Sequence, residues 1–287
     1  MEAKEIVTQV KKAKLYISKK RILEADSILD KLLKNINPIE IDQYGKVLDF
    51  NNRLEFILYC YMDKHTKISW TRNFLSEIYL LKGIIKFEDR NYKKAISYYE
   101  KALRWNPTSI LIYNEILEAY ISLKDFKKFN TYLQKAMKVA IRPVDIAILY
   151  KKISFVYEEQ GDSETAYNLL LYSKLFFPRK EADIEIAYLE NKFGTKFKYF
   201  PDLGTIEYLK ERNLEYKRPD YIIPTYISII KLMQDIMKKS ENQTKENYLI
   251  IMDYYSGLYF HKPSEDIHMQ MLSLQREYEL KFKEENV

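Results

Sequence analysis

Glycine and proline are scarce in this chain, with only six and eight residues among 287. A β-rich fold of this length would need many tight turns, and such turns call for glycine, asparagine or proline. Long helices joined by short connections need far fewer of these residues, so the scarcity favours a helical protein. The apolar fraction of 47% is enough for a continuous core, and the charged fraction of 31% is enough for a solvated exterior.

Cysteine and long apolar runs are also lacking. The single cysteine, Cys60, excludes an intramolecular disulfide and a cysteine-rich zinc site. It lies in an apolar run, where a small buried thiol is expected. No stretch approaches the roughly 18 apolar residues of a membrane span, and the N-terminus has no apolar signal core. We therefore expect a cytoplasmic protein without a membrane partner.

The usual signals of catalysis are absent from the sequence. There is no glycine-rich phosphate loop and no nucleophile elbow. Of the three histidines, His261 and His268 are separated by a proline, so one helical face cannot present both to a metal ion. Adjacent carboxylates such as Glu158 and Glu159 diverge by about 100° on a helix and do not share a proton as a catalytic pair does. The sequence predicts no enzyme, no catalytic residue, no metal and no cofactor, and an enzyme acting through the C-terminal helices is the less favoured alternative.

Charge of one sign is not concentrated anywhere. The net charge is +6, but 47 basic residues stand against 41 acidic ones. The densest basic cluster, residues 19–21, is followed by Glu24 and Asp26, which is typical of a solvated helix end. Because nucleic-acid-binding proteins usually gather their charge on one face, this pattern argues against a nucleic-acid partner. The many lysine, isoleucine, asparagine and tyrosine residues are typical of an AT-rich bacterial genome.

What the sequence does contain is a repeat. Residues 76–109 carry small and aromatic residues at fixed spacing: Tyr79, Gly83, Tyr92, Ala95, Tyr99, Ala102 and Pro107. This segment resembles the tetratricopeptide repeat, because the seven residues fall at the fourth, eighth, seventeenth, twentieth, twenty-fourth, twenty-seventh and thirty-second positions of that family. A glycine inside a helix costs about 1 kcal/mol relative to alanine, so a packing role is expected for Gly83, opposite Ala95 on the next helix.

Weaker copies of the repeat flank this segment. Residues 110–143 and 147–180 match at fewer positions, and residues 6–39 form a degenerate copy. Residues 40–75 depart from the pattern, and their periodicity predicts a long helix from Ile41 to about Asp63 that fills one repeat slot. For residues 1–201 we predict an all-α, right-handed superhelix of antiparallel helix pairs, an α-solenoid. Helical content should exceed two-thirds, with no sheet, and a β-sheet of three or more strands anywhere in the chain would contradict this fold.

The C-terminal region, residues 202–287, carries further helical periodicity. We predict helices near 203–213, 222–239, 244–260 and 264–284, after one at 181–193. Two arrangements stay open, because these helices can stack on the superhelix or form a bundle of their own. No feature indicates an oligomeric state.

The resemblance implies a scaffold whose partner is another protein or peptide. In similar proteins the first helices of successive repeats line a concave groove that receives an extended peptide or a helix. The corresponding residues here are Glu77, Leu80, Ile84, Phe87, Glu88, Leu111, Asn114, Glu118, Ile121, Ser122, Ile148, Lys151, Phe155, Glu158 and Glu159. This apolar floor with acidic walls predicts a peptide with apolar and basic side chains.

Three alternative interpretations exist for this groove. One subgroup of the family clamps a C-terminal carboxylate; Asn114 and Lys151 would suit that role, but Leu80 and Ile84 stand where polar residues are needed, so we reject it. A regulatory receptor for a signalling peptide, without DNA binding, is the second hypothesis, since residues 1–38 read as a repeat-like hairpin. In the third, the N-terminal or C-terminal helices fill the groove themselves.

Overall fold

The computed structural model describes residues 3–71, 73–178, 180–193 and 203–282. Of these residues, 75% are helical, which confirms the predicted helical content. The chain divides into two compact units. The first comprises residues 1–51, 65–140 and 144–216, and the second comprises residues 52–64, 141–143 and 217–287. Within the first unit, the Tyr150 hydroxyl donates to the Leu214 carbonyl at 2.8 Å. The domain boundary at residue 201 stays a prediction.

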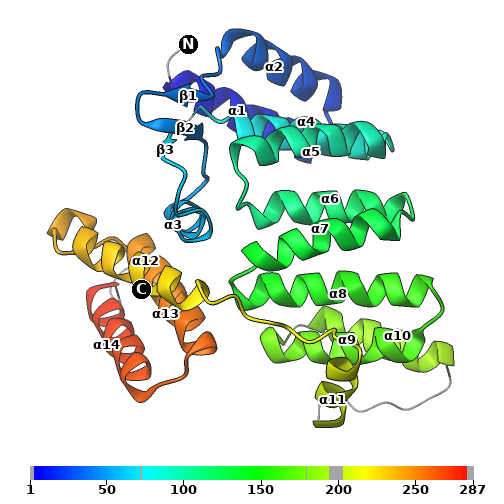
Figure 1. Ribbon diagram of the computed structural model, residues 1–287. Coiled ribbons are helices and arrows are strands. Elements are labelled where there is room, and N and C mark those ends of the chain that lie inside the picture. Colours follow the sequence, from blue (N-terminus) through cyan, green and yellow to red (C-terminus); the bar gives the residue numbers. More distant parts are fainter. Residues whose placement is uncertain (1–2, 72, 179, 194–202, 283–287) are drawn as a thin grey trace. The chain divides into compact units, whose positions relative to one another are not determined.

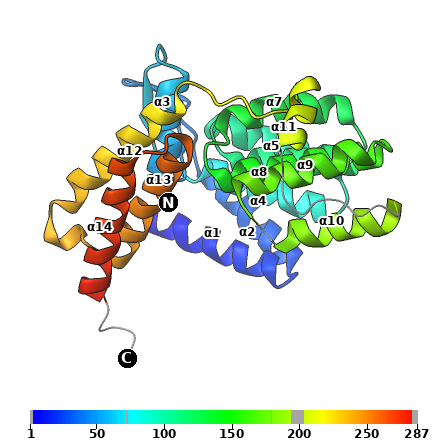
Figure 2. The ribbon, with the colours of Figure 1, turned by 90° about the horizontal axis from the view of Figure 1, so that it is seen from below.

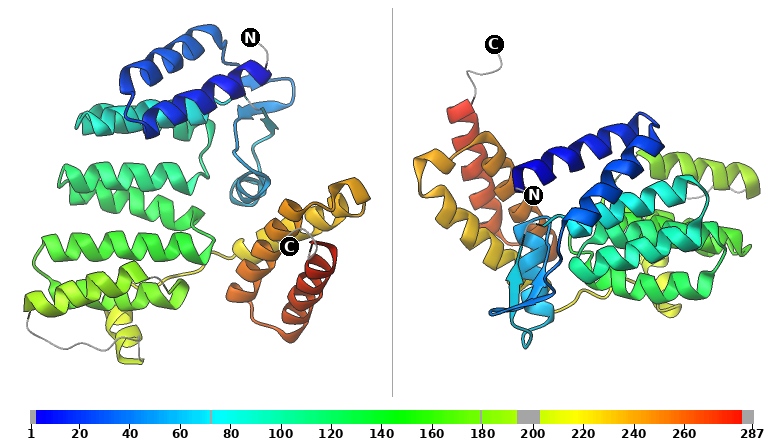
Figure 3. Two further views of the ribbon diagram at one scale, coloured as in Figure 1. Left: turned by 180° about the vertical axis from the view of Figure 1, so that it is seen from behind. Right: turned by 90° about the horizontal axis from the view of Figure 1, so that it is seen from above.

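The first unit is a stack of helix pairs (Figure 1; Figure 3). The pairs are α1 (Ala3–Ser18) with α2 (Ile22–Asn35), α4 (Leu75–Glu88) with α5 (Tyr92–Trp105), α6 (Ile110–Ser122) with α7 (Phe126–Val139), and α8 (Pro143–Glu159) with α9 (Ser163–Phe176). They are followed by α10 (Lys180–Phe193) and α11 (Leu203–Glu211), which both pack on α9. The all-α, tetratricopeptide-like solenoid is confirmed, including three consecutive pairs between residues 76 and 180.

A shared turn starts the second helix of three pairs. Asn91, Asp125 and Asp162 each accept a hydrogen bond from the backbone N–H three residues later, which caps the new helix. The residue before each cap has a positive φ; these residues are Arg90, Lys124 and Gly161. The residue with left-handed backbone conformation ends the first helix, and the cap residue begins the second, so the chain reverses direction within a few residues.

Gly83 faces the ring of Tyr99. A Cβ added at Gly83 would lie 2.2 Å from Tyr99 Cε1, so only a glycine allows the two helices this approach. The packing role predicted for Gly83 is present, but its nearest neighbour is Tyr99 and not Ala95. Both Tyr99 and Ala95 are fully buried.

The predicted long helix from Ile41 to Asp63 is wrong. The segment begins with two strands, β1 (Ile41–Asp42) and β2 (Gly45–Leu48), and only α3 (Arg53–Met62) is helical. Asp42 accepts hydrogen bonds from the backbone N–H groups of Tyr44 and Gly45, a turn that aspartate favours. At Gly45 φ is +131°, and a Cβ there would lie 2.1 Å from the Lys67 carbonyl oxygen. Because the backbones of Gly45 and Lys67 lie this close together, the segment forms a strand of a sheet and not part of a helix.

The expectation that the chain has no sheet is also wrong, because β3 (Ile68–Trp70) completes a sheet of three strands. β1 and β2 are antiparallel, and β2 and β3 are parallel. The strands are only two, four and three residues long, and they leave the helix pairs intact. Residues 40–75 fill no repeat slot, since Ile6, Val10 and Leu29 of the first pair share one apolar core with Ile78 and Ile85 of α4.

The second unit is a small helical bundle. It contains α3, α12 (Ile222–Met237), the short 3₁₀ helix η1 (Ser240–Asn242), α13 (Lys245–His261) and α14 (Glu265–Phe282). α12 packs on α3 and α13, and α13 and α14 lie side by side (Figure 2). The Tyr61 hydroxyl of α3 lies 2.8 Å from Ser228 Oγ of α12. Cys60, expected to be buried, is exposed because α3 buries Leu58 and Tyr59 instead.

His261 holds the segment 141–143 within this second unit. Its Nε2 lies 2.7 Å from the Ile141 carbonyl oxygen and donates to it, and the Tyr226 hydroxyl donates to the same oxygen at 3.2 Å. His261 is buried, and this burial, with a smaller contribution from the Arg218 charge, lowers the pKa of its imidazole.

We expect the second unit to lose stability when the pH falls below about 6.5, the ordinary pKa of histidine. The unfolded chain binds a proton on His261 that the folded unit resists, so acid favours unfolding, while stability is complete above that pH. Hydrogen–deuterium exchange of residues 222–261 at pH 7 and pH 5 measures this effect. His261→Gln keeps an N–H donor and should remove part of the difference, whereas the exposed His268→Gln should not. An unchanged pH dependence in His261→Gln would contradict the assignment.

Candidate functional site

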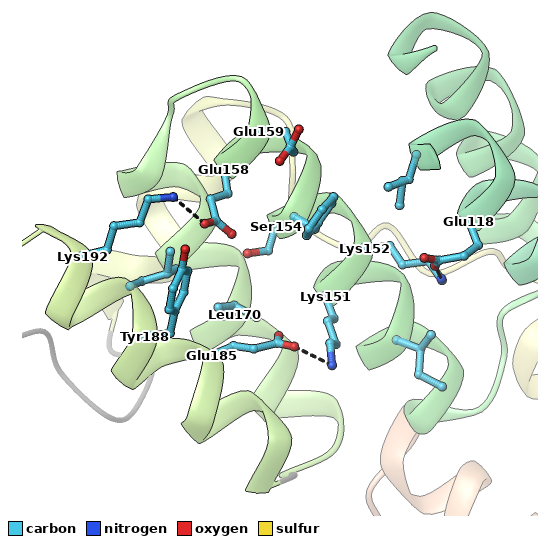
Figure 4. Close-up of a pocket in the computed structure, with 14 residues that line it drawn as sticks. Glu118, Lys151, Lys152, Ser154, Glu158, Glu159, Leu170, Glu185, Tyr188 and Lys192 are labelled. Carbon is cyan, nitrogen blue, oxygen red and sulfur yellow. Dashed lines mark hydrogen bonds and ion pairs between the residues drawn. The ribbon is translucent and has the colours of Figure 1, made fainter. Parts of the chain in front are cut away.

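A cavity opens on the first helices of successive pairs in the first unit. Its volume is about 760 Å³, within the range of ligand sites. Fourteen side chains line it, from α6, α8, α9 and α10 (Figure 4). The lining residues are Glu118, Ile121, Ile148, Lys151, Lys152, Ser154, Phe155, Glu158, Glu159, Leu170, Glu185, Tyr188, Leu189 and Lys192. We call this the α6–α8–α10 groove.

The floor of the groove offers two large apolar side chains to solvent. Phe155 of α8 is 45% exposed and Tyr188 of α10 is 54% exposed. Ile121 and Ile148 are half-buried beside them, while Leu189 is buried. Their residue spacing explains the position: Ile148 and Phe155 are two helical turns apart on one face of α8. Exposed aromatic rings gathered over a cavity mark a surface that is suited to a partner.

The charged side chains of the groove are paired between neighbouring repeats. Glu118 pairs with Lys152, Lys151 with Glu185 at 2.7 Å, Glu158 with Lys192 at 2.8 Å, and Glu159 with Lys124 at 2.6 Å. Four carboxylates and three lysines line the cavity, and Lys124 lies just beyond the lining. The walls are therefore nearly neutral. The prediction of acidic walls included Lys151 but not Lys152, Lys192 and Lys124, which pair with Glu118, Glu158 and Glu159.

These four pairs show a regularity that the sequence contains. Their partners are 34 or 35 residues apart, which is the length of one repeat. In a repeat stack, residues one repeat apart lie side by side on neighbouring first helices. Opposite charges at that interval are a signal that could have predicted the pairing. The same rule extends the groove to Glu185, Tyr188 and Lys192, which were missed because the sequence match fades after Pro178.

The five groove residues predicted on α4 lie outside this cavity. Leu80 is buried, and Ile84 is half-buried against the core shared with the first helix pair. Phe87 packs on the Tyr92 ring at 5.1 Å between centroids. The acids are also engaged: Glu77 pairs with Lys14, and Glu88 pairs with Lys20 at 2.7 Å. The N-terminal pair therefore contacts these α4 positions itself.

Seven of the predicted residues come together in the groove: Glu118, Ile121, Ile148, Lys151, Phe155, Glu158 and Glu159. Leu111 and Ser122 do not line it. Asn114 does not line it, and its Oδ1 is buried without a hydrogen-bond partner in the part of the chain that the structure describes.

Next to the groove, Glu115 receives a long hydrogen bond, 3.4 Å, from the Tyr99 hydroxyl. Burial raises the pKa of Glu115, and the Lys152 charge partly opposes that rise. This link joins the α4–α5 pair to α6, and so connects the repeat core to the helix that carries Glu118.

Residues 3–71, 73–178, 180–193 and 203–282 contain no group of three or more histidine, cysteine, aspartate or glutamate residues placed to hold a metal ion. None of the helices described is both long and apolar enough to cross a membrane.

Comparison with protein families agrees with the geometry of the α4–α5 pair. Residues 76–109 match the family described as tetratricopeptide repeat. The match covers the Gly83–Tyr99 contact and the helices of that pair, and it falls on the residues where the sequence pattern predicted the repeat. No curated protein matches the chain. A repeat of this kind suggests a protein-interaction scaffold.

Proposed function

We propose that this protein is a non-catalytic scaffold that binds a segment of another polypeptide in the α6–α8–α10 groove. The observation that carries the proposal is the pair of exposed rings, Phe155 and Tyr188, over a cavity of about 760 Å³. Aromatic anchors in a pocket supply most of the affinity at protein interfaces. A cytoplasmic location stays a prediction of the sequence.

The partner segment is expected to offer an apolar side chain to these rings and polar side chains to the rim. Because lysines pair with Glu118 and Glu158, the groove has no strong electrostatic reason to select a basic peptide. The paired charges at the rim should mainly tune the association rate and its dependence on salt. Lys151 is already engaged by Glu185, which also speaks against a carboxylate clamp.

Phe155→Ala and Tyr188→Ala are each expected to weaken partner binding by about 2 kcal/mol, roughly 30-fold. The partner is first isolated by affinity purification from the native cell, and its affinity is then measured by calorimetry. Both side chains are exposed, so stability should change by no more than about 0.5 kcal/mol.

Ile184→Ala is the matched control. Ile184 lies on α10, one turn before Tyr188, and is 69% exposed, but it does not line the cavity. Its loss should leave affinity unchanged. If the two aromatic variants bind as tightly as the wild type, the groove is not the binding site. A short diffusible peptide that raises the melting temperature, in place of a co-purifying protein, would favour the signalling-peptide receptor.

A further inference from the structure

A second cavity lies where the sheet meets the helices of the first unit. Its volume is about 380 Å³, and it shares no residue with the α6–α8–α10 groove. Lys46 of β2, Tyr79 of α4, and Lys101, Arg104 and Trp105 of α5 line it. We call it the β2–α5 pocket.

The base of this pocket is firmly built. Trp105 is only 8% exposed and packs with Val47 and Leu75 in one apolar cluster. The Trp105 carbonyl accepts a hydrogen bond from the Asp49 backbone N–H at 2.8 Å, which fixes the end of β2 against the end of α5. The strand that carries Lys46 and the helix that carries Lys101 and Arg104 are therefore held together.

Among the described residues, the three cations of the pocket form no ion pair. No carboxylate of the described residues lies within ion-pair distance of Lys46, Lys101 or Arg104. One carboxylate, Glu40, also lines the pocket and is likewise unpaired among those residues, so two positive charges remain in excess. In the α6–α8–α10 groove, by contrast, each carboxylate forms an ion pair with a lysine. The negative end of the α5 dipole stabilises Arg104, which lies in the last turn of that helix. Lys46 lies on the strand, so this dipole does not explain its position.

Aromatic rings hold one of these cations in place. The Lys101 ammonium lies 5.8 Å from the centre of the Tyr79 ring and 5.3 Å from that of Tyr98, and the two rings stack at 6.5 Å. Such contacts attract an ammonium group without neutralising its charge. The Tyr79 hydroxyl has no hydrogen-bond partner among the described residues, so it is a further free donor at the pocket.

We propose that the β2–α5 pocket binds an anionic group, a carboxylate or a phosphate. Arg104 offers a planar pair of donors that matches either group, and Lys46 and Lys101 add charge from two sides. The Tyr79 hydroxyl completes the set of donors. The anion comes either from a small molecule or from an acidic segment of a polypeptide. The proposal does not depend on the function of the groove.

Tryptophan fluorescence tests this site, because Trp70 and Trp105 are the only two tryptophans. Trp70→Phe leaves Trp105 as the sole reporter in the pocket. The probes are inorganic phosphate and tetraglutamate, each titrated at a constant ionic strength of about 0.15 M. We expect a saturable change with at least one probe. Phosphate alone indicates a small-molecule ligand, and tetraglutamate alone indicates an acidic segment.

Four substitutions test whether the anion binds in the β2–α5 pocket. Lys101→Gln and Arg104→Gln should each weaken binding about tenfold, because each removes about one charge-assisted hydrogen bond to the anion. Glu40→Gln should strengthen binding a few-fold, because it removes a negative charge from the pocket. Lys94→Gln makes the same charge change on an exposed residue of α5 outside the pocket, and it should have no effect. All four residues are exposed, and circular dichroism checks that each variant is folded. No saturation with either probe overturns the proposal, as does an equal loss in Lys94→Gln and Arg104→Gln.

Discussion

Removing both acids that surround Lys82, by Asp26→Ala with Asp30→Ala, should lower the free energy of unfolding of the first unit by about 3–5 kcal/mol. The Lys82 side chain is only 4% exposed, and its ammonium lies 2.6 Å from Asp26 and 2.7 Å from Asp30. Without these carboxylates a buried charge is left without a counter-ion. Urea unfolding followed by tryptophan fluorescence measures the loss, because both tryptophans belong to this unit.

The reverse deletion should cost much less. Lys82→Met leaves two carboxylates that are 25% and 55% exposed, so water can solvate them, and the apolar stem of the side chain is kept. We expect a loss of about 1 kcal/mol, in line with apolar replacement of a buried ion pair. Combining Lys82→Met with both alanine substitutions should then recover most of the loss. Equal losses in Lys82→Met and in the double alanine variant would show that the buried charge is not the cause.

The pH dependence of this cluster has a definite sign. Burial opposes the charge on Lys82, but hydrogen bonds from its ammonium to Asp26 and Asp30 outweigh that effect, and its pKa is raised. A group whose pKa is raised on folding adds stability that is complete below its ordinary pKa, about 10.4 for lysine. The contribution is lost only as the pH rises through the folded value. At neutral pH the full effect of the alanine substitutions should be seen.

The sequence predicted those features that depend on local spacing. The seven residues between 76 and 109 set the register of α4 and α5. The sheet was missed because it depends on a contact between Gly45 and the Lys67 backbone, which no helical period reveals. The residues of α3 were predicted to belong to a longer helix of the repeat stack. They pack instead on α12, more than 150 residues away along the chain, and local periodicity does not reveal such a distant contact.

The groove was predicted in part for the same reason. Phe155 and its neighbours on α8 follow from the position of the repeat along the chain. The near neutrality of the walls does not, because it depends on lysines one repeat away, such as Lys124 and Lys192. On α4, the predicted surface is covered because the first helix pair stacks directly on it once residues 40–75 leave the repeat. Neighbouring repeats thus decide both the charge and the extent of the groove.

Gly83→Ala should destabilise the first unit by about 3 kcal/mol, near the upper end of the range for overpacking. In an unconstrained helix the same change would stabilise by up to about 1 kcal/mol. The added methyl group would lie 2.2 Å from Tyr99 Cε1 and 2.3 Å from Cδ1, where no side chain fits. The ring cannot retreat easily, because Tyr99 is fully buried and its hydroxyl donates to Glu115 of α6. Urea unfolding followed by tryptophan fluorescence again gives the free energy.

A double-mutant cycle separates this clash from any general effect on α4. Tyr99→Leu alone should destabilise the unit, because a large buried ring is lost. With Tyr99→Leu already present, Gly83→Ala should cost at least 1 kcal/mol less than it costs alone, since the atoms that the methyl group meets are gone. Ser97→Ala, at an exposed position of α5, reports the ordinary effect of an added helix former and should be nearly neutral or slightly stabilising. If Gly83→Ala stabilises the protein as Ser97→Ala does, the close contact of α4 with Tyr99 is wrong, and the register of the repeat must be assigned again.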